Sequence, residues 1–86
     1  MDKAIIISDG CGACKTLVER LQQKGSLEKY RVINISSPEG VEIVSKLGIK
    51  AVPECILIMK DKEGNDMARV CTEQETQEVL KEASGS

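Results

Sequence analysis

The stretch that decides the fold is residues 3–14, KAIIISDGCGAC, in which a short apolar run leads directly into a pair of cysteines. The run over residues 3–8 is typical of a strand buried on both faces, and the serine, aspartate and glycine that end it are turn residues. A helix is expected to begin at Cys11, because aliphatic residues follow at helical spacing. The sequence therefore predicts a pair of cysteines at a strand-to-helix junction.

Three more strands and two more helices are predicted downstream. The strands are expected over residues 30–35, 55–59 and 67–71, and the polar stretch 60–66 is typical of a hairpin loop. Strands that alternate with helices imply parallel pairing with right-handed crossovers, and a final hairpin adds an antiparallel edge. We predict an α/β fold of order β-α-β-α-β-β-α, with a mixed four-stranded sheet and three helices. One domain is expected over residues 1–83, followed by a flexible tail at 84–86.

The second and third helices carry clear start signals. Ser37 followed by Pro38 is typical of an N-cap and a first helical residue. Thr72, with Glu75 three residues later, is typical of a capping box. The residues expected on the buried faces are Val41, Val44 and Leu47 in the second helix, and Thr76, Val79, Leu80 and Ala83 in the third.

Composition excludes several classes of protein. The 86 residues carry 12 basic and 14 acidic side chains, a net charge of -2, and Tyr30 as the only aromatic residue. The chain is not basic enough to attract a phosphate backbone, and it lacks the aromatic side chains that stack on bases, so nucleic acid is not expected as a ligand. The chain also has no apolar run of the ~20 residues that span a membrane, and its N-terminus lacks the pattern of a signal peptide. We therefore expect a cytoplasmic monomer that binds neither nucleic acid nor membrane.

The spacing Cys11-Gly12-Ala13-Cys14 favours thiol chemistry, because structural disulfides are rare in the cytosol. The thiolate is the nucleophile in disulfide exchange, and a free cysteine with a pKa near ~8.5 is mostly protonated at neutral pH. A helix N-terminus offers unpaired N–H groups and partial positive charge, so Cys11 is expected to ionise readily. We expect Cys11 to attack and the more buried Cys14 to resolve the mixed disulfide. The alternative is two cysteines that are neighbours without a shared role.

Residues 3–82 resemble the thioredoxin superfamily, closest to small glutaredoxin-like or mini-thioredoxin proteins. The resemblance is carried by the Cys11–Cys14 motif and by Ala51-Val52-Pro53. In that family the corresponding proline follows a cis peptide bond and lies against the active-site disulfide, which implies the same for Pro53. The alternative is that Pro53 only begins a strand.

The resemblance also implies an activity and its partners. It implies a thiol–disulfide oxidoreductase or electron carrier without a bound cofactor or metal, which reduces disulfide-containing proteins. The residues implied to bind substrate are Gly12, Ala13, Val52 and Pro53, with Val52 offering backbone groups to an extended peptide. The electron donor is expected to be glutathione or a partner of the thioredoxin-reductase type.

Three positions depart from the family pattern. Gly10 stands where thioredoxins carry an aromatic residue, and Ile5 stands where they bury an aspartate. Arg69-Val70 replaces the Gly-Gly pair with which glutaredoxins bind glutathione. The last departure favours a thioredoxin-reductase-type donor over glutathione.

The sequence also contains Cys55 and Cys71, outside the Cys11–Cys14 motif. Both are expected to be structural, as small buried hydrophobic residues, and the alternative for Cys55 is a third redox thiol near the active site. The main alternative for the whole chain is a soft-metal module in which the Cys11–Cys14 pair binds Cu(I) or zinc. Such modules end in a strand, whereas this chain is predicted to end in a helix. A structural zinc site needs four ligands, but the chain has no His, and Cys55 and Cys71 do not form a second C-x-x-C. A non-catalytic scaffold of the same fold would leave the Cys11–Cys14 pair unexplained.

Overall fold

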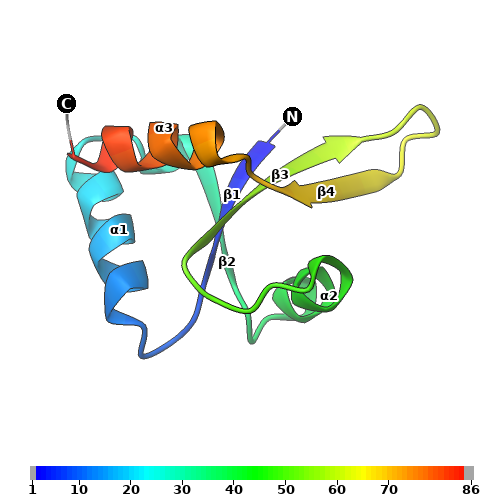
Figure 1. The fold of residues 1–86 in the computed structure, drawn as a ribbon, viewed down its shortest axis with the longest axis horizontal. Helices are drawn as coiled ribbons and strands as arrows, with labels where there is room; N and C mark the ends of the chain where they lie inside the picture. The colour runs from blue at the N-terminus through cyan, green and yellow to red at the C-terminus, as the bar shows by residue number, and fades with distance from the viewer. Residues whose placement is uncertain (1, 85–86) are drawn as a thin grey trace.

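The computed structural model describes residues 2–84, which form one sheet with helices on both of its faces (Figure 1). The elements in chain order are β1 (Asp2–Ile7), α1 (Gly12–Gln23), the 3-10 turn η1 (Leu27–Lys29), β2 (Tyr30–Asn34), α2 (Pro38–Leu47), β3 (Glu54–Lys60), β4 (Asp66–Val70) and α3 (Glu73–Ser84). The predicted order of strands and helices is confirmed. Helix α3 includes Ser84, the first residue of the predicted tail, and the other two tail residues lie outside the described range.

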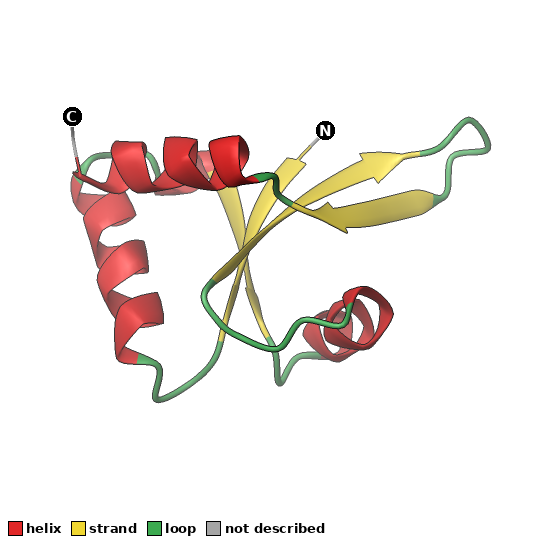
Figure 2. Cartoon of the chain, in the orientation of Figure 1, coloured by secondary structure: helices red, strands yellow, loops and turns green. Residues whose placement is uncertain are grey.

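The sheet is mixed, as predicted, with the strand order β2-β1-β3-β4 (Figure 2). Strand β1 pairs with β2 in parallel and with β3 in antiparallel fashion, and β3 pairs with β4 in an antiparallel hairpin. Strand β1 therefore lies between β2 and β3. The cysteine motif follows its carboxyl end, where the chain turns into α1.

The sheet divides the core into two layers, and β1 contributes to both because its side chains alternate between the two faces of the sheet. Ile5 packs with residues of α1 and α3, whereas Ala4 and Ile6 pack on the face that α2 covers. All three are 1% exposed or less. A near-continuous aliphatic strand is what a central position between two layers requires.

Two of the three residues predicted on the buried face of α2 lie there, and the third does not. Ile43, Val44 and Leu47 pack on the sheet, whereas Val41 is 55% exposed. The fourth inward position is Gly40, where a side-chain Cβ would collide with the carbonyl group of Asn34. Only a glycine allows the first turn of α2 to approach β2 so closely, and this contact sets the rotation of the helix.

Helix α3 begins at the predicted capping box. The Thr72 N–H donates to a Glu75 carboxylate oxygen at 2.8 Å, and the Glu75 N–H donates to the Thr72 hydroxyl oxygen at 3.2 Å. Val79 and Ala83 are buried as expected, whereas Leu80 is 47% exposed. No helix within residues 2–84 is long and apolar enough to cross a membrane.

Candidate active site

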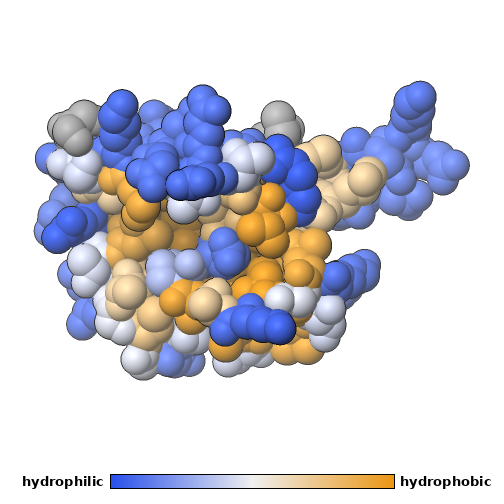
Figure 3. Space-filling model, in the orientation of Figure 1, coloured by the Kyte–Doolittle hydropathy of each residue, from blue (hydrophilic) through white to orange (hydrophobic). Residues whose placement is uncertain are grey.

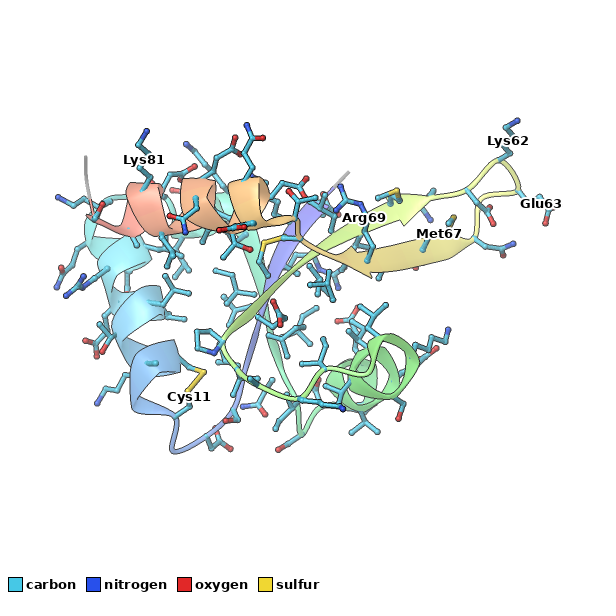
Figure 4. All side chains as sticks on the ribbon, in the orientation of Figure 1. Cys11, Lys62, Glu63, Met67, Arg69 and Lys81 are labelled. Carbon is cyan, nitrogen blue, oxygen red and sulfur yellow. A yellow bond between two sulfur atoms is a disulfide. The ribbon has the colours of Figure 1, made fainter. Side chains whose placement is uncertain are left out.

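The first half of the site is built by the turn from β1 into α1. Gly10 adopts a φ of +76°, a conformation that favours glycine, and the chain then enters α1 with Cys11 as its N-cap. The Cys14 N–H donates to the Cys11 Sγ at 3.1 Å, so a sulfur atom takes the place that a Ser or Asp oxygen fills at most helix N-termini. Cys11 and Cys14 form a disulfide, which Figure 4 shows at the start of α1. This is the junction that the sequence predicted.

The two cysteines of the motif differ in burial. Cys14 is only 1% exposed, whereas Cys11 is partly exposed, and Gly12 and Ala13 between them are open to solvent. An incoming sulfur atom therefore reaches Cys11 first. Helix α1 has no acidic residue in its first turn, so the first turn adds no negative charge that would oppose the effect of the positive helix end on the Cys11 sulfur.

The second half of the site is the segment that precedes β3. The Val52–Pro53 peptide bond is cis, as the family resemblance implied. The Cys11 Sγ lies 3.8 Å from the Val52 carbonyl oxygen. In the reduced protein the Cys11 thiol is therefore placed to donate to that carbonyl. The structure thus brings Cys11, Cys14 and Val52 together, with Gly12 and Ala13 on the adjoining surface.

Two polar residues that the sequence did not single out hold the loop before Cys11. The side-chain amide of Asn34, at the end of β2, donates to an Asp9 carboxylate oxygen at 3.0 Å. The Ile35 N–H donates to the Ile7 carbonyl at 2.9 Å, which continues the pairing of the two strands. The Asn34 carbonyl also accepts the Ser37 hydroxyl at 2.7 Å. One asparagine therefore connects the cysteine loop to the start of α2.

Cys55 and Cys71 form a second disulfide, so the expectation of two separate buried thiols is wrong. The cause is the register of the β3–β4 hairpin. Ile56 faces Val70 in that ladder, so Cys55 faces Cys71 one position further on, and the Cys71 N–H donates to the Cys55 carbonyl at 2.9 Å. Their Cα atoms are 5.3 Å apart, within the usual range for a disulfide. The expectation of a structural role is compatible with this pairing.

The N-terminus of α3 is occupied by the chain's own carboxylate. Arg69 donates two hydrogen bonds to Glu75, at 2.8 and 3.0 Å, and the Thr72 N–H donates to the same carboxylate. The Arg69 guanidinium and then the Thr72 N–H lower the pKa of Glu75 to about 2. This end of the helix therefore carries a permanent negative charge in the neutral pH range.

The strand order β2-β1-β3-β4, with α1 and α3 packed on one face, is that of the thioredoxin fold. The cysteine pair follows β1, and the cis Val52–Pro53 bond lies in the segment before β3. Two solved structures are similar to this protein. The Trx4 domain of ERdj5 superimposes with a TM-score of 0.57 at 15% identity, over 96% of this chain and 75% of that one. Thioredoxin 1 from the thermophilic eubacterium Thermosipho africanus superimposes with a TM-score of 0.52 at 22% identity, over 100% of both chains. No family model and no curated protein matches the sequence.

Proposed function

We propose that this protein is a thiol–disulfide oxidoreductase that reduces disulfides in other proteins, with Cys11 as nucleophile and Cys14 as resolving thiol. The observation that carries the proposal is the 3.1 Å hydrogen bond from the Cys14 N–H to the Cys11 Sγ at the N-terminus of α1. Hydrogen bonds to the charged form of a group, and the positive end of a helix, both favour ionisation. Cys11 is therefore expected to be the more acidic thiol.

The reaction transfers two electrons through the pair. The Cys11 thiolate attacks one sulfur of the client disulfide, and the other client sulfur leaves as a thiolate and takes up a proton. Cys14 then loses its proton and attacks the Cys11 sulfur, which releases the second client thiolate. The client gains two thiols, and the protein is left with the Cys11–Cys14 disulfide that the structure contains. No bound cofactor is needed, because the two sulfur atoms carry the electrons.

Client recognition is proposed to use the surface around these sulfur atoms. The Val52 carbonyl lies beside the Cys11 sulfur, Pro53 follows it in the chain, and Gly12 and Ala13, which follow Cys11, are exposed. An extended peptide placed between them meets backbone groups and small side chains, so its own side chains are not excluded. We propose disulfides in extended or flexible protein segments as the substrate class.

For the electron donor we propose a partner of the thioredoxin-reductase type in preference to glutathione. A helix N-terminus binds a carboxylate through free N–H groups. In α3 the Thr72 N–H is already bonded to Glu75, and Glu73 adds a second negative charge in the first turn. Both features oppose the carboxylates of glutathione. Efficient glutathione-dependent turnover of a small mixed disulfide would contradict this assignment.

A soft-metal function of the Cys11–Cys14 pair is not favoured. The element order β-α-β-α-β-β-α differs from the β-α-β-β-α-β order of the metal carriers with a similarly placed motif. The cytoplasmic location remains a proposal from composition, and the second disulfide counts against it, because structural disulfides are rare in the cytosol. The monomeric state and the lack of nucleic-acid and membrane partners are likewise proposals from composition.

The proposed function is tested by trapping the intermediate. Reduced protein is mixed with a disulfide-bonded peptide, and the products are separated under acidic, non-reducing conditions for mass spectrometry. We expect the wild type to release reduced peptide, and Cys14→Ser to accumulate a covalent complex through Cys11. The double variant Cys11→Ser/Cys14→Ser is the matched control. If Cys11→Ser instead accumulated the adduct through Cys14, or if reduced wild type left the peptide intact, the proposal would be wrong.

A further inference from the structure

The second disulfide lies at the end of the hairpin ladder, inside the core. Cys55 is 6% exposed and Cys71 8% exposed. Both belong to the cluster that includes Ile5, Leu57 and Val79, between the sheet and the helices α1 and α3. Disulfide exchange requires a thiolate to reach a sulfur atom, and access is one of the factors that set its rate. Packing therefore shields both residues of this disulfide, whereas the Cys11–Cys14 disulfide keeps one partly exposed residue, Cys11.

Its position links three parts of the molecule that surround the active site. Cys55 comes two residues after Pro53 and pairs with Ile5 of β1, the strand that leads to Cys11. Cys71 comes directly before Thr72, which caps α3. The disulfide therefore ties the start of α3 to the residues that immediately follow the proposed substrate-binding segment.

A small cavity shows that the same elements also share packing. It has a volume of about 50 Å³ and is lined in part by Pro53, Cys55, Leu17 of α1, and Thr76, Val79 and Leu80 of α3. Neither Pro53 nor the half-exposed Leu80 is packed tightly from every side. Figure 3 shows apolar surface along the lower side of α3, toward the middle of this face of the molecule. Because the cavity leaves Pro53 and α3 without full contact, we expect the Cys55–Cys71 disulfide to contribute to holding α3 in place relative to Pro53.

We propose that Cys55–Cys71 is a positioning disulfide: it stays closed during turnover and holds the Pro53 segment in place for client binding. This inference rests on the proposed function of Cys11 and Cys14. Each catalytic cycle passes two electrons through that pair alone. Opening the second disulfide requires two further electrons from an added dithiol or phosphine reductant, and two protons from that dithiol or, with a phosphine, from water.

The first experiment asks whether the two disulfides react separately. The oxidised protein is treated with one equivalent of dithiothreitol, alkylated under native conditions, and digested for mass spectrometry. We expect labels on Cys11 and Cys14 while Cys55 and Cys71 stay linked, and labels on all four only after reduction in denaturant. Comparable labelling of Cys55 in the folded protein would overturn the proposal.

The second experiment separates positioning from stability. Cys55→Ala/Cys71→Ala is compared with Leu47→Ala, a control that weakens the packing of α2 on the opposite face of the sheet and keeps the disulfide. We expect the cysteine double variant to show a KM for a disulfide peptide raised several-fold, with kcat and the alkylation pKa of Cys11 unchanged. The control should lose thermal stability without a change in KM. Should the double variant not fold, Cys55→Val/Cys71→Ala restores part of the lost volume.

Each result decides between the two proposals. An unchanged KM in the cysteine double variant, or an equal rise in Leu47→Ala, would show that the disulfide only stabilises the fold. A wild type that reduces no peptide would remove the proposed function, and the order of alkylation would then still show whether Cys55–Cys71 is shielded. A variant with raised KM but an altered Cys11 pKa would place the effect at the nucleophile and overturn the inference.

Discussion

Two cysteines of this chain lie beside a helix N-terminus, and their surroundings give them opposite properties. Cys11 is the N-cap of α1, and its sulfur accepts the Cys14 N–H. Cys71 lies one residue before the cap of α3, where the Thr72 hydroxyl accepts the corresponding N–H from Glu75. A shift of one position along the chain replaces a sulfur cap with a hydroxyl cap and directs the Cys71 sulfur into the core.

The charges at the two helix ends reinforce this difference. The first turn of α1 carries no acidic residue, whereas that of α3 carries Glu73 and Glu75. The partial positive charge of α1 is thus available to the Cys11 sulfur, and that of α3 is neutralised by the chain itself. The comparison predicts that Cys11 is the reactive one of these two cysteines, because the first turn of α1 adds no carboxylate beside its sulfur.

The largest expected effect is on turnover. Cys11→Ser should show no reduction of a disulfide peptide above the uncatalysed rate, because the hydroxyl of serine is a far weaker nucleophile than a thiolate. Cys55→Ala/Cys71→Ala should keep the kcat of the wild type. Both are measured as release of free thiol under saturating peptide. A turnover defect of equal size in the second variant would erase the distinction between the two pairs.

The next effect is on the free energy of unfolding, to which Cys55–Cys71 is expected to contribute more than Cys11–Cys14. Closing a loop restricts the unfolded chain more as the loop lengthens, so the 16-residue separation of Cys55 and Cys71 is expected to contribute about 3 kcal/mol. The separation of 3 residues between Cys11 and Cys14 is expected to contribute about 2 kcal/mol by the same relation. Urea unfolding of Cys55→Ala/Cys71→Ala and of Cys11→Ser/Cys14→Ser, each with its remaining disulfide closed, measures both. A larger loss from the second variant would contradict the assignment of roles.

The first cysteine pair could be predicted from the sequence because its geometry is local. A strand, a turn and a helix within residues 3–14 are enough to place Cys11 at the helix N-terminus. The second pair depends on strand register, which is a tertiary property. A signal for it was nevertheless present: Lys60 and Asp66 flank the hairpin loop and face each other, and counting five positions outward from each reaches Cys55 and Cys71.

The helix faces show a different limit of the sequence. Val41 and Leu80 fit a helical spacing of aliphatic residues, yet both are largely exposed. In α2 the contact of Gly40 with the Asn34 carbonyl fixes the rotation of the helix, and the absence of a side chain gives no hydrophobic signal. The hydrogen bond between Asn34 and Asp9 was missed for a related reason, since it joins polar residues 25 positions apart.

A smaller effect is expected when the end of α1 is made to resemble that of α3. Ala13→Glu places a carboxylate in the exposed first turn beside Cys11. A charge at a helix terminus is worth ~0.3–1 kcal/mol, so the pKa of Cys11 should rise by about half a unit. The rate of iodoacetamide alkylation against pH measures it. Gln23→Glu, which adds the same charge at the other end of α1, is the control and should leave the Cys11 titration unchanged.

The smallest effect concerns the cap of α3, through the pH dependence of stability. Hydrogen bonds from Arg69 and then from the Thr72 N–H lower the pKa of Glu75 from its ordinary value of 4.5 to about 2. A carboxylate with a lowered pKa in the folded state stabilises that state most fully above the pKa of the unfolded chain. The contribution is lost as the pH falls from about 4.5 toward 2, because the folded protein must then bind a proton that the unfolded chain binds more readily.

Glu75→Gln tests this assignment by thermal unfolding between pH 7 and pH 2. At pH 7 the variant should melt a few degrees below the wild type, and the gap should close as the pH approaches 2, since the wild type loses the ionised form there. Glu73→Gln removes the same charge from the same turn without touching the capping box, and should give a smaller and flatter difference. A constant gap for Glu75→Gln across the whole range would mean that the carboxylate contributes by shape and neutral hydrogen bonding. The negative charge assigned to this helix end, and the contrast with α1, would then be lost.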